Sequence, residues 1–175
     1  MIAERIKESV RDIQDFPKPG IIFKDITTIL KDPELCSDIV VAMKDQLDGV
    51  KIDAVAGIES RGFFFGLQLA QALNVPFVPI RKAGKLPYKT IVESYDLEYG
   101  SAVIECHEDA LESGQQVLIH DDLLATGGTV IAATKLIEQL GANVAAYSFV
   151  ISLDFLDGKK KLTPYSDQVY VLASY

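Results

Sequence analysis

The sequence has few of the residues that form disulfide frameworks or zinc sites. Its 175 residues include only two cysteines, Cys36 and Cys106, which lie far apart and lack metal-ligand spacing. Neither a disulfide framework nor a zinc site is therefore indicated. This cysteine usage favours a reduced, cytoplasmic setting.

Positive charge is also scarce. The chain has 17 Lys and Arg residues against 25 Asp and Glu residues, and its formal net charge is −8. A general nucleic-acid binder needs Lys and Arg clustered over a whole face, because much of its affinity comes from phosphate contacts. We therefore expect no nucleic-acid partner, and an anionic ligand would have to be bound by a local basic patch.

Long apolar runs are missing as well. No window reaches the roughly 18 apolar residues of a membrane span, so we expect no membrane partner. The first residues interleave charged and apolar side chains and lack the apolar core of a signal peptide. The length instead fits a single domain, residues 1–175, with enough chain for a proper hydrophobic core.

What the sequence does contain is a series of short apolar runs that alternate with helical patterns. Such runs are typical of strands covered on both faces, and helices between them predict a parallel sheet with helices on both sides. The fold class is therefore α/β with a mostly parallel twisted sheet. The expected helices are 2–13, 35–47, 62–73 and 128–140, and the expected strands are 52–58, 75–80, 116–120, 144–152 and 169–173, the last of them at an edge.

One stretch, residues 81–98, breaks the alternation. Gly84 and Pro87 lie near its start, and loops of this length in compact domains are more often functional lids than neutral connectors. We expect a long mobile excursion there. A simple surface hairpin is the alternative.

The most informative segment joins an apolar strand to a loop of small residues that opens a helix. It reads VLIHDDLLATGGT over residues 117–129. Backbone N–H groups of residues 126–129 at a helix N-terminus would bind a phosphate, and Gly127 and Gly128 would allow its close approach. The loop has neither the Walker pattern nor the dinucleotide fingerprint, so it indicates a phosphate site of another kind.

Two acidic residues, Asp121 and Asp122, precede this loop. Two carboxylates would repel a phosphate, but they suit a ligand that also offers hydroxyls. A ribose 5-phosphate would place its ring hydroxyls on the carboxylates, directly or through a hydrated Mg²⁺. The alternative is that the acids only cap the helix start, where negative charge is favoured.

The segment DDLLATGGT at 121–129 resembles the phosphoribosyl-pyrophosphate signature of type I phosphoribosyltransferases, in the form typical of members that use adenine. Four further segments resemble that family in the same order, so the resemblance covers almost the whole chain. It implies the type I phosphoribosyltransferase-like fold, with a small hood mainly from about residues 1–30 and a flexible lid of about residues 82–97. The four segments are FPKPGIIFKDIT at 16–27, ESRGF at 59–63, RKAGKLP at 81–87 and YDLEYG at 95–100.

The resemblance also implies a reaction. In purine salvage, the 5-phosphoribosyl group of 5-phosphoribosyl-1-pyrophosphate is transferred to adenine, which yields AMP and pyrophosphate. Mg²⁺ is the implied cofactor, carried by the sugar donor without direct protein ligands and contacting Asp121 or Asp122 through water. The family is usually homodimeric, and we expect the same here.

Site residues follow from the matched segments. The resemblance assigns the ribose to Asp121 and Asp122, and the 5-phosphate to Ala125, Thr126, Gly127, Gly128 and Thr129. It assigns pyrophosphate to Glu59, Ser60 and Arg61, in a loop that often has a cis peptide before the serine, and to Arg81, Lys82 and Lys85. Positive charge there would stabilise the leaving pyrophosphate; a solvated surface loop is the usual meaning of such a basic run.

The base site is also assigned by resemblance. Adenine would stack between Phe23 and Leu153, while backbone groups of Ile22 and Lys24 read its edge. Phe23 is equally explained as a core residue, as most phenylalanines are. Glu98 resembles the family's proposed general acid/base, which takes or holds a proton of the base; a glutamate that anchors the lid is the alternative.

Three positions depart from the family pattern. His120 stands where an aliphatic residue is usual, Ser152 where an acid is common, and Lys24 where many relatives have Arg. We expect His120 to be a hydrogen-bonded residue at a strand end and not a catalyst. Ser152 would alter the base pocket, and Lys24 lacks the planar fork of Arg.

Two rival functions remain open. An enzyme for hypoxanthine, guanine or xanthine would need a pocket that reads a 6-oxo purine, and the contexts of Phe23 and Glu98 resemble those of adenine users instead. A non-catalytic sensor of purines or of the sugar donor would usually carry an added DNA-binding segment. The chain has neither the length nor the basic face for one.

Overall fold

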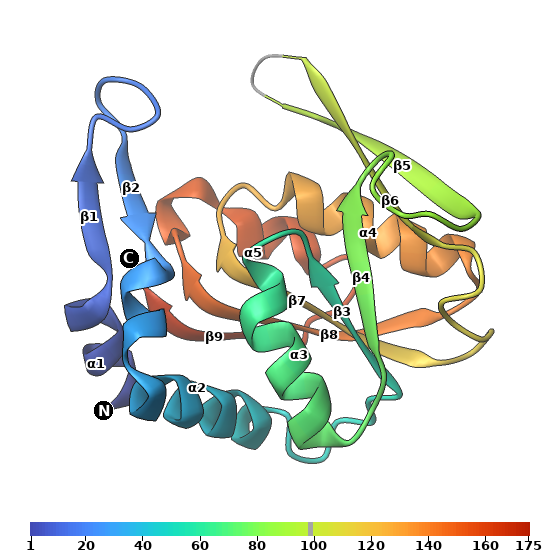
Figure 1. Ribbon diagram of the computed structural model, residues 1–175, viewed down its shortest axis with the longest axis horizontal. Helices are drawn as coiled ribbons and strands as arrows, with labels where there is room; N and C mark the ends of the chain where they lie inside the picture. The colour runs from blue at the N-terminus through green and yellow to red at the C-terminus, as the bar shows by residue number, and fades with distance from the viewer. Residues whose placement is uncertain (98–99) are drawn as a thin grey trace.

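A central sheet organises the molecule. The computed structural model describes residues 1–97 and 100–175, and within them a seven-stranded sheet has the order β5-β6-β4-β3-β7-β8-β9, beside a two-stranded sheet of β1 and β2 (Figure 1). The strands are β1 (Arg11–Gln14), β2 (Ile22–Asp25), β3 (Ala54–Ile58), β4 (Phe77–Lys82), β5 (Thr90–Asp96), β6 (Ser101–His107), β7 (Gln116–Leu124), β8 (Asn143–Ser152) and β9 (Val169–Ser174).

Strands β4, β3, β7, β8 and β9 run parallel, whereas β6 is antiparallel to both β4 and β5. The mostly parallel sheet expected from the sequence is therefore confirmed, and β9 is the edge strand. The helices are α1 (Ile2–Ser9), α2 (Pro33–Gln46), α3 (Gly62–Leu73), α4 (Gly128–Gln139) and α5 (Gly158–Leu162), with 3-10 turns η1 (Ile26–Lys31) and η2 (Asp154–Leu156).

Two hydrophobic cores cover the two faces of the sheet. Successive strand residues point to opposite faces, so Ala54 and Ala56 of β3 pack in the core that includes α4, while Val55 packs in the core of α1, α2 and α3. The side chains of β7 alternate between the two cores in the same way. The uninterrupted apolar runs in the sequence are explained by this burial on both faces.

Local signals set the ends of the helices. Asp32 accepts a hydrogen bond from the backbone N of Leu35 (3.0 Å), and Pro33 occupies the first turn, so α2 begins where Pro is favoured. Helix α3 ends at Asn74 in the left-handed conformation (φ 56°). The expected helices 35–47, 62–73 and 128–140 are confirmed with small shifts at their ends.

The expectation of one helix from Ile2 to Ile13 is wrong. Helix α1 ends at Ser9, Val10 is extended (φ −68°, ψ 131°), and Ile13 pairs with Phe23 in the antiparallel β1–β2 hairpin. Arg11 Nη2 also donates to Asp25 Oδ2 across the two strands (2.6 Å). Apolar spacing near the end of a helix cannot distinguish another helical turn from a strand that finds a distant partner.

Residues 81–98 contain a strand instead of a long irregular excursion. Strand β4 continues to Lys82, and β5 pairs with β6 over its whole length, from Thr90↔His107 to Asp96↔Ser101. The alternative of a surface hairpin is therefore confirmed for the described part. The β5–β6 hairpin rises from one end of the sheet (Figure 1), and closure of it as a lid stays a prediction.

No helix within residues 1–97 and 100–175 combines the length and apolarity that a membrane crossing would need.

Candidate active site

Part of the sequence-predicted site lies at the carboxyl ends of the neighbouring parallel strands β3 and β7. The β1–β2 and β5–β6 hairpins rise on either side of this edge (Figure 1). Ligands of open α/β sheets bind at such an edge. A cavity of about 410 Å³ lies there, and the residues that line it are Phe23, Glu59, Ser60, Arg61, Lys82, Asp121 and Asp122.

Arg61 contacts two other residues that line this cavity. It precedes the first residue of α3, and its Nε lies 3.1 Å from Oδ2 of Asp122. The same guanidinium lies over the Phe23 ring. One cationic side chain therefore contacts both an acid at the end of β7 and an aromatic ring on the β1–β2 hairpin.

Asp122 is deeply buried, at 2% exposure. Its Oδ2 has no hydrogen-bond donor among the described residues, because the contact with Arg61 brings the charges together without hydrogen-bond geometry. Burial raises the pKa of Asp122, and the positive charge of Arg61 opposes this shift. A buried acceptor without a donor is costly, so its most direct explanation is a ligand that supplies the donor.

Asp121 differs in its surroundings. Its Oδ1 accepts a hydrogen bond from the backbone N of Asp122 (2.8 Å) and packs against Gly62, where an added Cβ would lie 3.0 Å from that oxygen. Burial of the carboxyl raises the pKa of Asp121 well above its usual value, and the negative charge of Asp122 raises it further. Both acids lie on strand β7 itself, which extends to Leu124 and thus beyond the expected end at residue 120.

The candidate phosphate loop, residues 125–129, follows β7 and opens α4. Gly127 has φ 82°, a left-handed conformation that favours glycine, and its carbonyl accepts from the backbone N of Ile131 (2.9 Å). The loop residues do not line the cavity that Arg61 and Asp122 line. Gly128 lines a neighbouring cavity of about 350 Å³ together with Tyr95 and Asp96 of β5.

Gly158 supports this loop and was missed by the sequence reasoning. A Cβ at Gly158 would lie 2.2 Å from the carbonyl oxygen of Ala125, and a Cβ at Gly127 would lie 3.3 Å from the carbonyl oxygen of Gly158. The two glycines thus let the start of α5 pack directly on the loop. An isolated glycine far downstream in the sequence carries no pattern that predicts this contact.

Glu59 binds other parts of the protein. Its Oε2 accepts from Nε of Arg81 (3.1 Å) and from the backbone N of Lys82 (2.9 Å). Burial tends to raise the pKa of Glu59, but these donors and the positive charges of Arg81 and Lys85 together lower it. The peptide bond between Glu59 and Ser60 is cis, as the resemblance implied. Lys82 lines the same cavity as Arg61, whereas Arg81 and Lys85 do not.

The residues assigned to the base fall on two sides of strand β2. Phe23 faces the cavity of Asp122, while Ile22 and Lys24 line a separate cavity of about 450 Å³ with Leu153. This division follows from the alternation of side chains along a strand. The structure therefore does not bring Phe23 and Leu153 together around one cavity.

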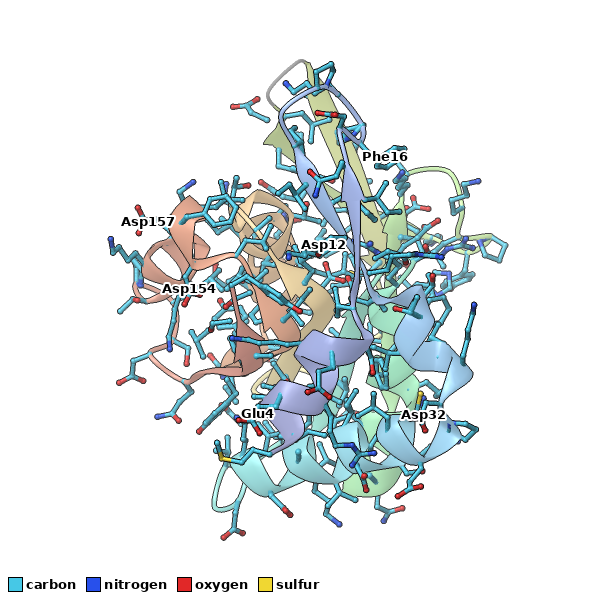
Figure 2. All side chains as sticks on the ribbon, turned by 90° about the vertical axis from the view of Figure 1, so that its left-hand side faces the viewer. Glu4, Asp12, Phe16, Asp32, Asp154 and Asp157 are labelled. Atoms are coloured by element: carbon cyan, nitrogen blue, oxygen red, sulfur yellow. The ribbon has the colours of Figure 1, made fainter. Side chains whose placement is uncertain are left out.

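Two of the three residues that depart from the family pattern, Lys24 and Ser152, have local partners. Lys24 Nζ donates to Asp12 Oδ1 (2.7 Å) and lies 4.1 Å from the centre of the Tyr175 ring. Figure 2 shows Asp12 along the β1–β2 hairpin, below Phe16, which lies near the tip of the hairpin. A compact ammonium suits this position between a carboxylate and a ring. Ser152 Oγ donates to Asp154 Oδ1 (2.5 Å), so an acidic side chain is held two residues after the departure.

The expectation of a hydrogen-bonded His120 is wrong. Its side chain is fully buried, and neither ring nitrogen has a hydrogen-bond partner with acceptable geometry in the described parts of the chain. Burial lowers the pKa of His120 to about 4, although the backbone of Ser148 has a small opposing effect. His120 is thus an uncharged residue of the interior next to the acid pair.

Glu98 lies outside the described residues. Within residues 1–97 and 100–175, no three or more His, Cys, Asp and Glu side chains are grouped so that they could hold a metal ion.

Comparisons with known proteins agree with this fold. Residues 25–172 match the family described as the phosphoribosyl transferase domain. An adenine phosphoribosyltransferase of Cytophaga hutchinsonii is 54% identical over 175 residues, which is 100% of this chain and 97% of that protein.

Solved structures are similar over the same extent. The adenine phosphoribosyltransferase of Thermoanaerobacter pseudethanolicus superposes with a TM-score of 0.95 at 48% identity and covers 99% of both chains. That of Saccharomyces cerevisiae, in complex with adenine and an imino-altritol bisphosphate, has a TM-score of 0.90 at 42% identity and covers 98% of both chains. The chain belongs to the phosphoribosyltransferase family and, within it, to the adenine phosphoribosyltransferases.

Proposed function

We propose that this chain transfers the 5-phosphoribosyl group from 5-phosphoribosyl-1-pyrophosphate to adenine and releases AMP and pyrophosphate, a reaction of purine salvage. The observation that carries the proposal is the 410 Å³ cavity, in which an acid pair, a guanidinium and an aromatic ring meet. These groups suit the three parts of the reaction: a ribose with hydroxyls, an anionic leaving group and a flat base. Membership of the adenine-using branch supports adenine as that base.

The acid pair and Arg61 act on the sugar donor. Asp122 Oδ2 accepts a hydrogen bond from a ribose hydroxyl, which supplies its missing donor. Arg61 and Lys82 face the pyrophosphate and stabilise the negative charge that grows as the bond from C1′ to its oxygen breaks. The backbone N–H groups of residues 126–129 hold the 5-phosphate at the start of α4, so both ends of the donor are fixed.

The β1–β2 hairpin acts on the base. Phe23 provides a ring face, and among the described residues strand β2 pairs only with β1. The other edge of β2 therefore leaves backbone N–H and C=O groups of Ile22 to Lys24 available to read the edge of adenine. Leu153 would join this pocket only after a rearrangement that brings it to the side of Phe23.

We assign the proton that adenine loses to Glu98, on its position in the LEYG segment after β5. Glu98→Ala is expected to lower the rate at saturating substrates while leaving the affinity for the donor nearly unchanged. An unchanged saturated rate would contradict the assignment and leave the glutamate as an anchor of the segment.

Mg²⁺ is proposed to accompany the sugar donor. The carboxylates of Asp121 and Asp122 fit this ion, because Mg²⁺ prefers oxygen ligands and often keeps its waters, and Asp122 Oδ2 accepts no hydrogen bond from the described residues. When bound to pyrophosphate, the ion neutralises part of the charge of the leaving group. Chelation of Mg²⁺ should therefore abolish turnover. It should also weaken binding of the sugar donor.

A homodimer and a cytoplasmic location complete the proposal. Large apolar side chains stay exposed on α3, with Phe64 at 41% and Leu67 at 48%, and an apolar surface is what a second copy would cover. Sedimentation velocity would test the dimer, and a monomer at all concentrations would contradict it. Both cysteines are free, which fits a reducing compartment.

A steady-state assay tests the function as a whole. Adenine, hypoxanthine and guanine are offered separately with Mg²⁺ and the sugar donor, and formation of nucleotide and pyrophosphate is measured. Turnover confined to adenine is expected; turnover of a 6-oxo purine would contradict the assigned base. Tight donor binding without any turnover would favour a sensor, and Asp122→Ala is expected to weaken donor binding in either case.

A further inference from the structure

A buried carboxylate contacts the basic segment between β4 and β5. Glu105, on β6, is only 4% exposed. Its Oε1 accepts from the backbone N atoms of Lys85 (2.9 Å) and Leu86 (2.8 Å), and its Oε2 accepts from Oγ1 of Thr90 (3.2 Å). One side chain therefore ties the middle of the connection to the first residue of β5.

The other end of the same turn is held by Glu59. This carboxylate binds the Arg81 guanidinium and the backbone N of Lys82, and Arg81 Nη1 donates in turn to the carbonyl of Lys85 (3.4 Å). The backbone N of Ala83 donates to the carbonyl of Val103 on β6 (3.0 Å). Turn 82–86 is therefore fixed at both ends and in its middle, although its side chains reach solvent.

Charge makes this arrangement informative. A negative side chain beside the cations of the turn reduces the local positive charge, and burying it is costly. Burial tends to raise the pKa of Glu105, but the hydrogen bonds from the turn and from Thr90 outweigh it and lower the pKa. Glu105 therefore stays ionised at a cost, next to a turn that is proposed to bind an anion. This cost is explained if Glu105 holds the backbone of the turn in place.

We propose that Glu105 is a positioning residue that presets turn 82–86, so that Lys82 and Lys85 meet the leaving pyrophosphate without a further loss of backbone freedom. This inference rests on the proposed function, in which the turn binds pyrophosphate. It divides the predicted lid of about 82–97 into a preset basic turn and the β5–β6 hairpin beyond it. Glu105 itself touches no substrate.

Three variants of the full chain test the proposal. Glu105→Ala removes the acceptor, whereas Glu105→Gln keeps an oxygen that can accept from both amides. Glu108→Gln is the matched control, because it removes the same charge near the same segment from a side chain that is 45% exposed and pairs loosely with Lys89 at 3.8 Å. Surface pairs of this kind contribute little.

Glu105→Ala is expected to raise the KM for the sugar donor about tenfold, while the KM for adenine changes little, because the loss of hydrogen bonds to a charged group is confined to the turn. Glu105→Gln should recover most of the donor affinity, and Glu108→Gln should match the unmodified chain. Equal losses for both substrates, or no loss in Glu105→Ala, would overturn the proposal.

Calorimetric titration with Mg²⁺-pyrophosphate separates this inference from the proposed function. A weaker pyrophosphate affinity in Glu105→Ala, with recovery in Glu105→Gln, is expected even if no purine is turned over. If Glu105→Ala does not fold, Thr90→Val removes only the Oε2 donor and should shift pyrophosphate affinity in the same direction by a smaller factor. An unchanged pyrophosphate affinity in a folded Thr90→Val would then count against the proposal.

Discussion

The guanidinium carbon of Arg61 lies 5.3 Å from the centre of the Phe23 ring. Phe23 belongs to the β1–β2 hairpin and Arg61 to the turn between β3 and α3, so this cation–π contact joins two parts of the chain that are far apart in the sequence. Because Arg61 also pairs with Asp122, the candidate surfaces for base, pyrophosphate and ribose meet at a single side chain.

Replacement of the ring tests the base surface. Phe23→Leu keeps an apolar side chain but loses the π face, and the KM for adenine should rise about fivefold because aromatic stacking contributes roughly 1 kcal/mol beyond area burial. The KM for the sugar donor should change less. Tyr165→Leu, a partly exposed aromatic outside the described cavity, is the control in the same steady-state assay. A larger effect on the donor than on adenine would count against the role of Phe23.

Asp121→Asn should stabilise the folded chain at neutral pH. The folded-state pKa of Asp121 lies well above the ordinary value of 3.8, so ionisation costs folding free energy that is absent below about pH 4 and grows as pH rises toward the raised pKa. Asparagine keeps the oxygen that accepts from the backbone N of Asp122. Thermal unfolding at pH 4 and pH 8 should show a higher Tm for the variant only at pH 8, together with weaker donor binding. A lower Tm at pH 8 would contradict the inferred cost.

Asp25 is expected to contribute to stability with the opposite sign from Asp121. Hydrogen bonds from Thr27 and then from Arg11 lower its pKa from 3.8 to about 2, despite burial. The ionised carboxylate therefore stabilises the folded state fully above about pH 4, and this contribution is lost as pH falls through about 2. Asp25→Asn should reduce the free energy of unfolding by about 2 kcal/mol at pH 7, as measured by urea denaturation.

The difference between the unmodified chain and Asp25→Asn should shrink when the pH is lowered from 4 toward 2. Asp48→Asn, an exposed acid after α2, serves as the control and should change stability little at either pH. A difference for Asp25→Asn that does not depend on pH would mean that its packing matters more than its charge.

Gly158→Ala tests the support of the phosphate loop. The new Cβ would stand 2.2 Å from the carbonyl oxygen of Ala125, so the loop must shift. We expect a KM for the sugar donor raised by about tenfold or more, and a loss of stability of about 1–3 kcal/mol, as is typical of overpacking.

Gly49→Ala provides the comparison for Gly158→Ala. Gly49 has φ 77° and open space around it, so alanine there strains the backbone without touching the loop. It should reduce stability but leave the donor KM unchanged. A similar donor KM in both variants would show that the loop does not depend on Gly158.

Local patterns were enough to predict the central elements. Strands β3, β7 and β8 are largely buried on both faces and therefore read as continuous apolar runs, and α3 and α4 follow β3 and β7 with glycines at their first residues. The acid pair and the glycine loop were also predictable, because they directly follow one such run along the chain.

Elements that depend on distant partners were not predictable in this way. Arg11–Gln14 forms a strand only because Ile22–Asp25 lies beside it, and β6, which no apolar run predicted, pairs with β4 and β5. The placing of Phe23 and Leu153 on different cavities depends on which way the β1–β2 hairpin is turned toward the sheet.

Patterns of neighbouring residues were enough to predict the α/β class, the succession of buried strands along the chain, and the segment that carries the acids and the phosphate loop, because burial and turn chemistry depend on adjacent residues. The contacts of Arg61 with Phe23 and Asp122, of Glu105 with the basic turn, and of Gly158 with the loop became evident only in the folded chain. Each of these contacts joins residues far apart in the chain, and their strength depends on distance and burial that arise only when the sheet is assembled.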